Sequence, residues 1–334
     1  MILTGIGIID SRRQALAVAG NYAANNGTYY YSGDGLTWYA GSGPNFFSPT
    51  QIAWNGTYWL AGGGSNGANP NVLTKSTDGK IWTLQSAPFV GCTAVYAIIW
   101  DGTKWMIGTN AGIYTSTNGT TWASSGSATV TISIAYSGSL YVAVGNTLGT
   151  VRYSSNGTSW TTVSAGTFNA QSISSVFWDG TNFWLGMQNS AAGQYASYRS
   201  NTGSTWFAST TANTVFQTSG FGGLKGGARS GGAKTLGFGL LNTSKNIVGQ
   251  LSTAGSTTWS ALVAYPGGFG ANGFINQCFY DGTKFLALTK SSTLPLAYSY
   301  DGNTWYKAAG VSANTGLTFG GLAGKTNKTV QPQF

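Results

Sequence analysis

The residues that could do acid–base chemistry in this sequence are few and of one kind. All seven acidic residues are aspartates, and the chain of 334 residues contains no glutamate and no histidine. Glycoside hydrolysis usually needs two carboxyl groups that face each other across the sugar. A zinc site or a Ser-His-Asp triad would need histidine, or more cysteines than Cys92 and Cys278. The positions of the aspartates therefore decide which chemistry is open to this protein.

The aspartates occupy two kinds of recurring turn. One kind has the form Ser-x-Asp-Gly-x-Thr-Trp and contains Asp34, Asp78 and Asp301. The other is an Asp-Gly pair flanked by aromatic residues, as in "WDGTKW", and contains Asp101, Asp179 and Asp281. Asp10 stands in the equivalent turn of the first unit. Because every carboxylate has a turn to make, we expect no catalytic residue, no metal ion and no other cofactor.

The Ser-x-Asp-Gly-x-Thr-Trp motif, called the box below, recurs seven times at spacings of 38 to 52 residues. Such spacing is typical of a radial array in which each repeat is one four-stranded unit. Asn replaces Asp in two copies, while Thr202 and Ala254 give up its hydrogen bonding. The other box positions are Ser32, Asp34, Gly35, Trp38, Ser76, Asp78, Gly79, Trp82, Ser116, Asn118, Gly119, Trp122, Ser154, Asn156, Gly157, Trp160, Ser200, Gly203, Trp206, Ser252, Gly255, Trp259, Ser299, Asp301, Gly302 and Trp305.

A second repeat interleaves with the boxes. Stretches that join two aromatic residues through a short turn begin at residues 54, 100, 136, 178 and 280. Asn-Gly and Asp-Gly between apolar runs are strong hairpin signals, because both turn positions favour positive φ. Each unit is therefore expected to hold two hairpins. With 51 glycines, 7 prolines and no long helical periodicity, the chain is predicted to be all-β.

These boxes make the sequence similar to the Asp-box (BNR) repeat proteins with sialidase-like β-propellers, and the resemblance covers nearly the whole chain. It implies a seven-bladed β-propeller of four-stranded antiparallel blades, with an Asp-box in each blade. We expect a single propeller domain over residues 1–324 and a C-terminal tail over 325–334. The stretch 316–324 has strand character, so we expect it to help seal the ring against the first unit.

We interpret the box as a structural turn rather than a catalytic site. Its Asp or Asn side chain can accept backbone hydrogen bonds, its Gly supplies left-handed geometry, and its Trp is an apolar anchor between neighbouring sheets. Trp82 and Trp122 have the most regular surroundings, and we expect both to be buried between blades. Cys92 and Cys278 fall in different units, so we expect free, buried thiols.

The resemblance also implies what a sialidase mechanism would need, which is a tyrosine nucleophile polarised by glutamate, an aspartate acid and an arginine triad. Glutamate is missing here, and the five arginines do not recur in a sialidase pattern. We therefore expect a protein that is not an enzyme. Two alternatives stay open, a glycoside hydrolase of sialidase-like type and a protein-assembly scaffold.

The composition is rich in Ser, Thr, Asn, Gly and aromatic residues and only 7% charged. In this respect the sequence resembles tail-fibre and capsid-surface proteins of phages and large viruses. We expect a virion or cell-surface structural protein that recognises a host-surface glycan during attachment or decorates a particle. Its expected location is the virion surface or the extracellular space.

The binding surface can be placed from the expected topology. If four strands run up and down in each unit, both motif turns share one face, and the variable loops share the other. Aromatic rings stack on sugars while amides and hydroxyls bind the sugar hydroxyls, so carbohydrate is a sensible ligand. Alternatively, these rings cover the channel mouth or pack against neighbouring subunits. The candidate binding residues are Tyr22, Phe46, Phe47, Phe89, Tyr195, Phe216, Lys225, Arg229, Tyr265 and Phe269.

The net charge of +9 favours acidic partners, but the lysines and arginines are scattered, and general solvation explains them better. No basic stripe of the nucleic-acid type is visible, so we expect no sequence-specific DNA or RNA binding. The first residues, "MILTGIGIID", are too short an apolar run for a membrane span. We expect the partners to be other structural proteins of a particle or a surface glycan, and assembly into a homo-oligomer is left open. The glycine-rich stretch 221–232 reads as a loop that carries Lys225 and Arg229 to the variable face.

Overall fold

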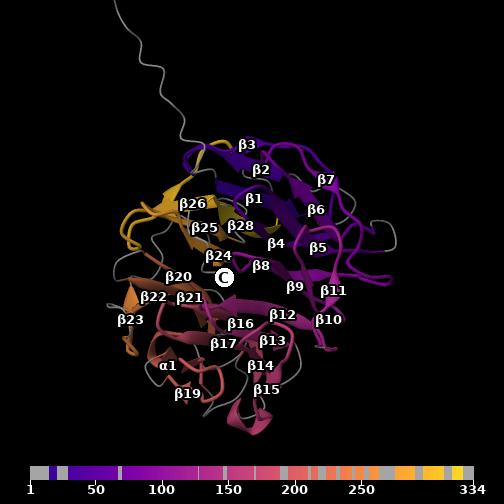
Figure 1. Ribbon diagram of the computed structural model, residues 1–334. Helices are drawn as coiled ribbons and strands as arrows, with labels where there is room; N and C mark the ends of the chain where they lie inside the picture. Colours follow the sequence, from indigo (N-terminus) through magenta and orange to yellow (C-terminus); the bar gives the residue numbers. More distant parts are fainter. Residues whose placement is uncertain are drawn as a thin grey trace, which may run out of the picture.

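The computed structural model describes residues 15–20, 29–66, 70–126, 128–145, 149–168, 171–188, 195–209, 212–216, 223–230, 234–242, 245–251, 256–262, 275–289, 296–311 and 318–325. Within these residues the strands form seven antiparallel sheets of four strands each. Figure 1 shows the sheets arranged radially around a common centre. The prediction of an all-β, seven-bladed β-propeller with four-stranded blades is confirmed.

We number the blades from 1 to 7 and give their strands in that order, from the centre outwards. The innermost strands are β28 (Thr318–Gly324), β4 (Ser48–Trp54), β8 (Val95–Trp100), β12 (Thr131–Tyr136), β16 (Ser172–Trp178), β20 (Gly223–Arg229) and β24 (Ile275–Tyr280). The second strands are β1 (Ala15–Gly20), β5 (Trp59–Gly64), β9 (Trp105–Thr109), β13 (Tyr141–Gly145), β17 (Phe183–Gln188), β21 (Thr235–Asn242) and β25 (Phe285–Thr289). The third strands are β2 (Tyr29–Ser32), β6 (Leu73–Ser76), β10 (Gly112–Ser116), β14 (Val151–Ser154), β18 (Ser197–Ser200), β22 (Lys245–Leu251) and β26 (Leu296–Ser299). The outer strands are β3 (Tyr39–Ala40), β7 (Thr83–Leu84), β11 (Ala123–Ser124), β15 (Thr161–Thr162), β19 (Phe207–Ala208), β23 (Trp259–Leu262) and β27 (Tyr306–Lys307).

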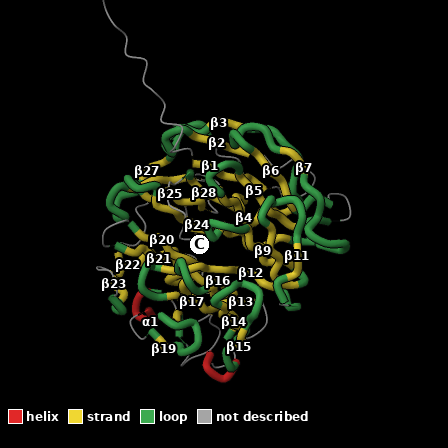
Figure 2. The backbone as a smooth tube through the Cα atoms, in the orientation of Figure 1, coloured by secondary structure: helices red, strands yellow, loops and turns green. Residues whose placement is uncertain are grey.

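Helix plays a minor part in this fold. A 3₁₀ turn, η2 (Ala165–Phe168), and a single α-helical turn, α1 (Ala212–Val215), lie at the outside of the ring in Figure 2. In the part of the chain that the structure describes, no helix has the length and hydropathy needed to cross a membrane. The strands alone therefore build the scaffold.

The ring is closed by joining the two ends of the chain in blade 1. β28 pairs antiparallel with β1, with Ala15 opposite Gly324 and Leu16 opposite Ala323. The prediction that 316–324 helps to seal the ring against the first unit is confirmed for the strand 318–324. β28 also packs against β4, where a Cβ atom on Gly320 would lie 1.9 Å from the carbonyl oxygen of Pro49. Only glycine fits such a close approach of two backbones.

The innermost strands are tied to one another by side chains. Pairing between the first and second strands shifts register in every blade, next to Gln51 in blade 2 and Gln277 in blade 7. Gln51 Oε1 accepts the Ile98 N–H of blade 3 at 2.9 Å, and Gln277 Oε1 accepts the Leu322 N–H of β28 at 2.6 Å. β8 and β28 are edge strands of their sheets, and these bonds satisfy backbone N–H groups on the inner edge, where no further strand of the same sheet pairs.

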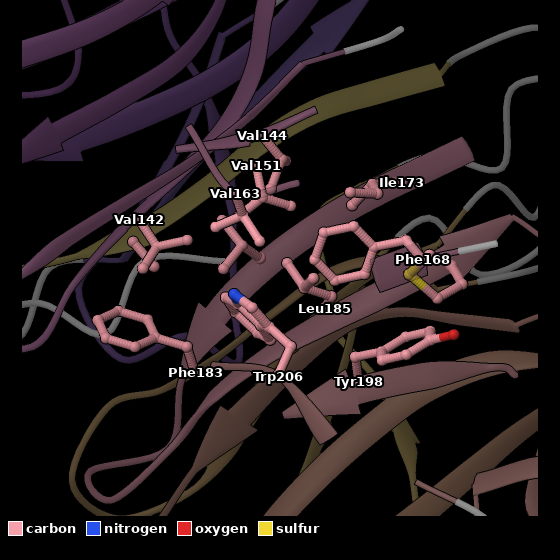
Figure 3. Packing of buried hydrophobic residues seen from close by; sticks show 13 residues of the cluster. Val142, Val144, Val151, Val163, Phe168, Ile173, Phe183, Leu185, Tyr198 and Trp206 are labelled. Carbon is pink, nitrogen blue, oxygen red and sulfur yellow. The ribbon is translucent and has the colours of Figure 1, made fainter. Parts of the chain in front are cut away.

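The apolar core lies between the blades, and the box tryptophans are part of it. Figure 3 shows one example, a cluster that contains Trp206 of blade 5 together with Val142, Val144 and Val151 of blade 4. Each of the seven tryptophans packs against the preceding blade in this way. Trp38 meets blade 7, Trp82 blade 1, Trp122 blade 2, Trp160 blade 3, Trp206 blade 4, Trp259 blade 5 and Trp305 blade 6.

The seven tryptophans are not equally buried. Trp82 is only 3% exposed and stacks on Tyr29 of blade 1, with ring centroids 4.7 Å apart. Trp122 is only half-buried, so the expectation that it is buried like Trp82 was wrong. The indole N–H shows the same difference, because Trp82 Nε1 donates to Gly79 O at 3.1 Å whereas Trp122 Nε1 has no partner among the described residues.

The difference between these two tryptophans can be tested by mutation. Trp82→Ala removes a fully packed indole, so we expect it to lower the free energy of unfolding by about 3 to 5 kcal/mol. Trp122→Ala removes a half-exposed indole whose N–H is unpaired, and we expect roughly half that loss. Urea unfolding followed by circular dichroism measures both. Equal losses for the two variants would contradict the packing described here.

The closure of the ring gives a second prediction. A chain that stops after residue 317 lacks β28, which leaves blade 1 without its inner strand. We expect this chain to lose the cooperative thermal transition, because the inner ring can no longer close. A chain that stops after residue 325 keeps β28 and serves as the control, with an unchanged melting temperature. If both chains melt at the same temperature, β28 does not close the ring.

Candidate functional site

The strand order gives the disc two different faces. In blades 2 to 7 the first hairpin turn and the box lie at one end of the strands, which we call the turn face; in blade 1 the box lies there beside the paired strand ends Ala15 and Gly324. The remaining connections lie at the opposite end, the loop face. Neighbouring blades touch along the turn face, where Lys234 Nζ in the hairpin turn of blade 6 donates to Asp301 O in the box of blade 7 at 2.9 Å. This bond joins the turns of blades 6 and 7 on the turn face.

The Asp-containing boxes share one pattern of internal hydrogen bonds. In the first box, Ser32 Oγ donates to Asp34 Oδ1 at 3.0 Å and accepts the Gly35 N–H at 2.8 Å. Asp34 Oδ1 also accepts the N–H groups of Leu36 and Thr37 at 2.8 and 2.9 Å. Gly35 has a φ of 74°, a conformation that only glycine adopts readily. These bonds hold the turn that brings Trp38 against blade 7.

Substituted boxes keep part of this wiring. Asn118 and Asn156 each accept two backbone N–H groups through Oδ1, as the aspartates do. Thr202 was expected to give up the bonding, but its Oγ1 still accepts the Thr205 N–H at 3.3 Å. Ala254 lies outside the described residues, together with Ser252 and Gly255. The described boxes therefore share an oxygen acceptor at this position and do not need its negative charge.

The hairpin aspartates have the same structural task. Asp101 Oδ1 accepts the N–H groups of Thr103 and Lys104 at 2.7 and 2.8 Å. Asp179 and Asp281 bind the backbone of their own turns in the same pattern. Asp34, Asp78 and Asp301 hold the boxes in the same way. All six aspartates in the described part of the chain therefore hold turns. Asp10 lies outside it.

These hydrogen bonds make the carboxyl groups more acidic. Burial by itself would raise the pKa of Asp34, Asp78, Asp281 and Asp301, but hydrogen-bond donors outweigh burial and hold each pKa below the ordinary value of 3.8. At Asp101 burial is likewise outweighed, by donors that include Tyr141 and Lys104, and the pKa falls to about 2. A general acid needs a pKa shifted in the opposite direction.

Asp101, Lys104 and Tyr141 form the group that most resembles a reactive site. Tyr141 OH donates to Asp101 Oδ2 at 2.5 Å, and Lys104 Nζ lies 2.9 Å from the same oxygen. Tyr141 is buried, and burial together with the neighbouring carboxylate raises its pKa, so the phenol stays protonated and is not a nucleophile. Because Asp101 belongs to blade 3 and Tyr141 to blade 4, the group joins two blades.

The aromatic residues predicted to bind ligand on the loop face have different fates. Phe46 and Phe216 are buried in the core, so the expectation that they are exposed was wrong. Phe46 fills space over Gly63, where a Cβ would lie 2.5 Å from its ring, and Phe216 packs edge-on against Trp259. Phe89 and Tyr195 are half-buried, against Tyr114 and Tyr198 respectively. Phe47 alone among the described candidates is exposed, at 46%.

The cationic candidates lie in a strand. The glycine-rich stretch expected to be a loop forms β20, because its glycines make room for the core: a Cβ on Gly227 would lie 2.5 Å from the ring of Phe177. Arg229 is the last residue of β20, so its backbone is at the turn face and not at the loop face where we expected it. Lys225 lies within the strand at the register shift. Tyr22, Tyr265 and Phe269 lie outside the described residues.

The structure adds one residue to the loop face that the sequence did not single out. Val90 is fully exposed, in the connection between blades 2 and 3 and next to the half-buried Phe89. This connection is held down by backbone bonds, since Ser65 N–H donates to Thr93 O at 2.8 Å and Asn110 N–H donates to Ala94 O at 3.3 Å. The sequence signal for Val90 was its position in a loop that varies between the blades.

Cys92 and Cys278 are free, buried thiols, as predicted. Burial raises the pKa of the Cys92 thiol to about 11, and it raises that of Cys278 as well. A thiol that does not ionise near neutral pH is a poor nucleophile.

Comparison with known proteins supports the fold. No family model matches the sequence, and no curated protein matches it. Solved structures do match, beginning with YCF48 bound to a D1 peptide, at a TM-score of 0.59 and 16% identity over 85% of this chain and 93% of that chain. The chain has a β-propeller fold.

Two further structures are similar to this β-propeller. YCF48 from Cyanidioschyzon merolae matches at a TM-score of 0.57 and 14% identity, over 86% of this chain and 97% of that chain. A catalytically inactive virginiamycin B lyase from Staphylococcus aureus with quinupristin matches at 0.56 and 13%, over 82% and 92%. Identities this low show that the fold is shared and nothing more.

The aspartate pKa values predict the pH dependence of stability. Because the folded-state pKa values lie below 3.8, these groups stabilise the fold above about pH 4 and lose that contribution as the pH falls towards 2. Without Glu or His, no side chain has an ordinary pKa between about 5 and 8. We expect the melting temperature to be flat over pH 5 to 8 and to fall below pH 4.

Asp101→Asn tests the largest of these shifts. Asn55 makes the same turn bonds in blade 2, so Asn at position 101 keeps the hairpin but removes the charge and the Oδ2 acceptor that Tyr141 and Lys104 contact. At pH 7 we expect a loss on the order of 2 kcal/mol in the free energy of unfolding, shrinking towards zero near pH 2. Chemical denaturation at both pH values measures it. A loss that is the same at pH 7 and pH 2 would show that the charge of Asp101 does not stabilise the fold.

Proposed function

We propose that this protein is a non-catalytic binding propeller of a virion or cell surface, which uses its loop face to recognise a surface glycan or to attach to other structural proteins. The observation that carries the proposal is that the carboxylates are engaged in holding turns. Every described aspartate holds a turn through its Oδ1 atom. A propeller whose described acidic residues are all engaged in this way offers a ligand its rigid frame and its loops.

Hydrolysis of a glycoside is the competing proposal, and the site chemistry disfavours it. The reaction needs a carboxylic acid that is still protonated near the working pH. Five of the aspartates have pKa values lowered instead, and Asp179 Oδ2 accepts the Trp184 indole N–H at 2.7 Å in the core. Tyr141 and Asp101 form a tyrosine–carboxylate pair, but both side chains are buried, so a sugar cannot reach them.

The loop face supports a binding role. Phe47 and Val90 expose apolar surface on connections that flank blade 2. Phe47 N–H donates to Gly64 O at 3.1 Å, and Asn71 Nδ2 donates to Asn45 O at 2.9 Å, so the first connection is fixed to the frame. Apolar groups on a pre-ordered base bind with a smaller entropic cost than mobile ones.

The box wiring supports the assignment to the Asp-box class of propellers, and the composition supports a particle surface as its location. A protein-assembly scaffold is the second candidate function. Phe47 and Val90 carry no charge, and apolar side chains of this kind fit a peptide as well as a sugar face. The structurally similar YCF48, which has been solved bound to a D1 peptide, shows that a propeller of this general shape can take a peptide.

Binding by the loop face can be tested with a pair of matched variants. Phe47→Ser and Val90→Ser together should weaken binding to the host-cell surface or glycan array by at least tenfold, because two apolar contacts are lost. Phe207→Ser, which alters a side chain of similar exposure (51%) on an outer strand, is the control and should change little. The wild type is also incubated with sialosides and aryl glycosides. Clear turnover, or equal binding by all variants, would contradict the proposal.

A further inference from the structure

Three Asn-Gly-Thr stretches in the described part of the chain share one sequence but lie in two different settings. Asn118 and Asn156 belong to the boxes of blades 3 and 4, whereas Asn55 belongs to the first hairpin turn of blade 2. An Asn-Gly pair can lose ammonia spontaneously, because the glycine nitrogen attacks the side-chain amide carbon and no Cβ atom on the glycine hinders the approach. The shared sequence gives the three asparagines closely similar reactivity, so a large difference between them has to come from the fold.

The amide oxygen is held in the same way at all three positions. Asn55 Oδ1 accepts the N–H groups of Thr57 and Tyr58 at 2.9 and 2.8 Å. Asn118 Oδ1 and Asn156 Oδ1 each accept two backbone N–H groups at 2.8 to 2.9 Å. Two donors on this oxygen stabilise the negative charge that develops there when a nucleophile attacks the amide carbon. The amide carbon is thus activated alike at the three positions.

The glycine nitrogen that must attack is bound in the boxes and free in the hairpin turn. Gly119 N–H and Gly157 N–H each donate to the serine of their own box at 2.8 Å. Gly56 N–H has no hydrogen-bond partner among the described residues. Attack within a box therefore first requires the loss of a buried hydrogen bond, which leaves a donor or acceptor unsatisfied. Attack on Asn55 has no such requirement.

Solvent access separates the two settings in the same direction. The attacking nitrogen must give up its proton to water or hydroxide. Gly56 is exposed, and a Cβ atom there would meet nothing within 4 Å. Gly119 and Gly157 are buried. A Cβ atom on them would lie 2.9 Å from Tyr58 OH of blade 2 and 2.6 Å from Met106 Cε of blade 3, respectively. A base in solution can therefore reach the nitrogen of Gly56, whereas the preceding blade covers the glycines of the two boxes.

We propose that Asn55 is a site of spontaneous deamidation in the native protein. Gly56 N bonds to Asn55 Cγ, the Cγ–Nδ2 bond breaks, and Nδ2 leaves as ammonia with the proton from the glycine nitrogen. Water then opens the resulting succinimide at either of its two carbonyl groups, which leaves aspartate or isoaspartate at position 55. The reaction needs no reactant besides water, and it is independent of the function proposed for the loop face.

The aspartates at the equivalent position of other blades are protected by their charge. Burial is outweighed by hydrogen-bond donors at Asp101 of blade 3 and Asp281 of blade 7, so the pKa of each lies below 3.8 and both are ionised near neutral pH. An ionised carboxylate is a poor electrophile, because an oxide would have to leave in place of ammonia. Asparagine is therefore the reactive residue in this turn, and an aspartate formed from it persists.

Isoaspartate at position 55 would disturb a contact between blades. Tyr58, whose N–H is bound by Asn55, accepts the Trp105 indole N–H of blade 3 at 2.8 Å through its hydroxyl group. An isoaspartyl link adds a methylene group to the backbone and moves the acceptor oxygen within this turn. Deamidation is therefore expected to loosen the junction of blades 2 and 3 as the protein ages, to the extent that isoaspartate forms.

The test incubates the full-length protein at mildly alkaline pH and follows the three Asn-Gly-Thr stretches by peptic digestion and mass spectrometry. In the native protein Asn55 should deamidate about ten- to a hundredfold faster than Asn118 and Asn156, because only the box glycines must first lose a hydrogen bond. In urea the three should react at similar rates, which isolates the effect of the fold. Equal rates in the native protein, or reaction of Asn55 in urea alone, would overturn the proposal.

Ser116→Ala is the matched variant, because it removes the acceptor of Gly119 N–H and leaves the box of blade 4 unchanged. It should raise the rate at Asn118 and leave the rates at Asn55 and Asn156 as they are. An unchanged rate at Asn118 would overturn the protective role of this hydrogen bond. Asn55→Asp keeps the turn acceptor without the amide, so its melting temperature should stay constant during the incubation while that of the wild type falls. A constant melting temperature in a wild type that has accumulated isoaspartate would overturn the effect on the blade junction.

Discussion

The packing of each box tryptophan against the preceding blade is the interaction on which the rest of this structure depends. Trp38 of blade 1 packs on blade 7, which makes the relation cyclic and leaves no terminal blade with an open apolar face. The box exists to aim this indole, since the serine and the aspartate hold the turn and the glycine permits its geometry. The inner strands of neighbouring blades are also joined by side chains, since Gln51 and Gln277 each accept a backbone N–H of the next blade.

This use of the repeat has a consequence for chemistry. An aspartate that accepts two backbone N–H groups is stabilised as the anion, and a residue with that task cannot also hold a proton for a substrate. Substitution by Asn118 and Asn156 without loss of the turn shows that the fold uses the oxygen and not the acidity. This supports the proposal that binding is a task of the loops, where the blades differ from one another.

Repetition is also why the fold could be predicted from the sequence. Seven boxes at regular spacing specify the turns, and the two-residue hairpins specify the first strands. The binding candidates were harder, because burial of a loop residue depends on contacts between distant segments. Phe46 is buried because Gly63 lacks a side chain, and the stretch around Gly227 forms a strand because Phe177 needs the space.

The central claim is that the carboxylates hold turns and do not catalyse. Carbon-detected NMR titration of the aspartate carboxyl groups tests it most directly, since the sequence contains only seven of them and no glutamate. The account predicts that Asp34, Asp78, Asp101, Asp281 and Asp301 all titrate below the ordinary value of 3.8. A pKa above about 5 at any of these five would mark a carboxyl poised as a general acid, and would contradict the account.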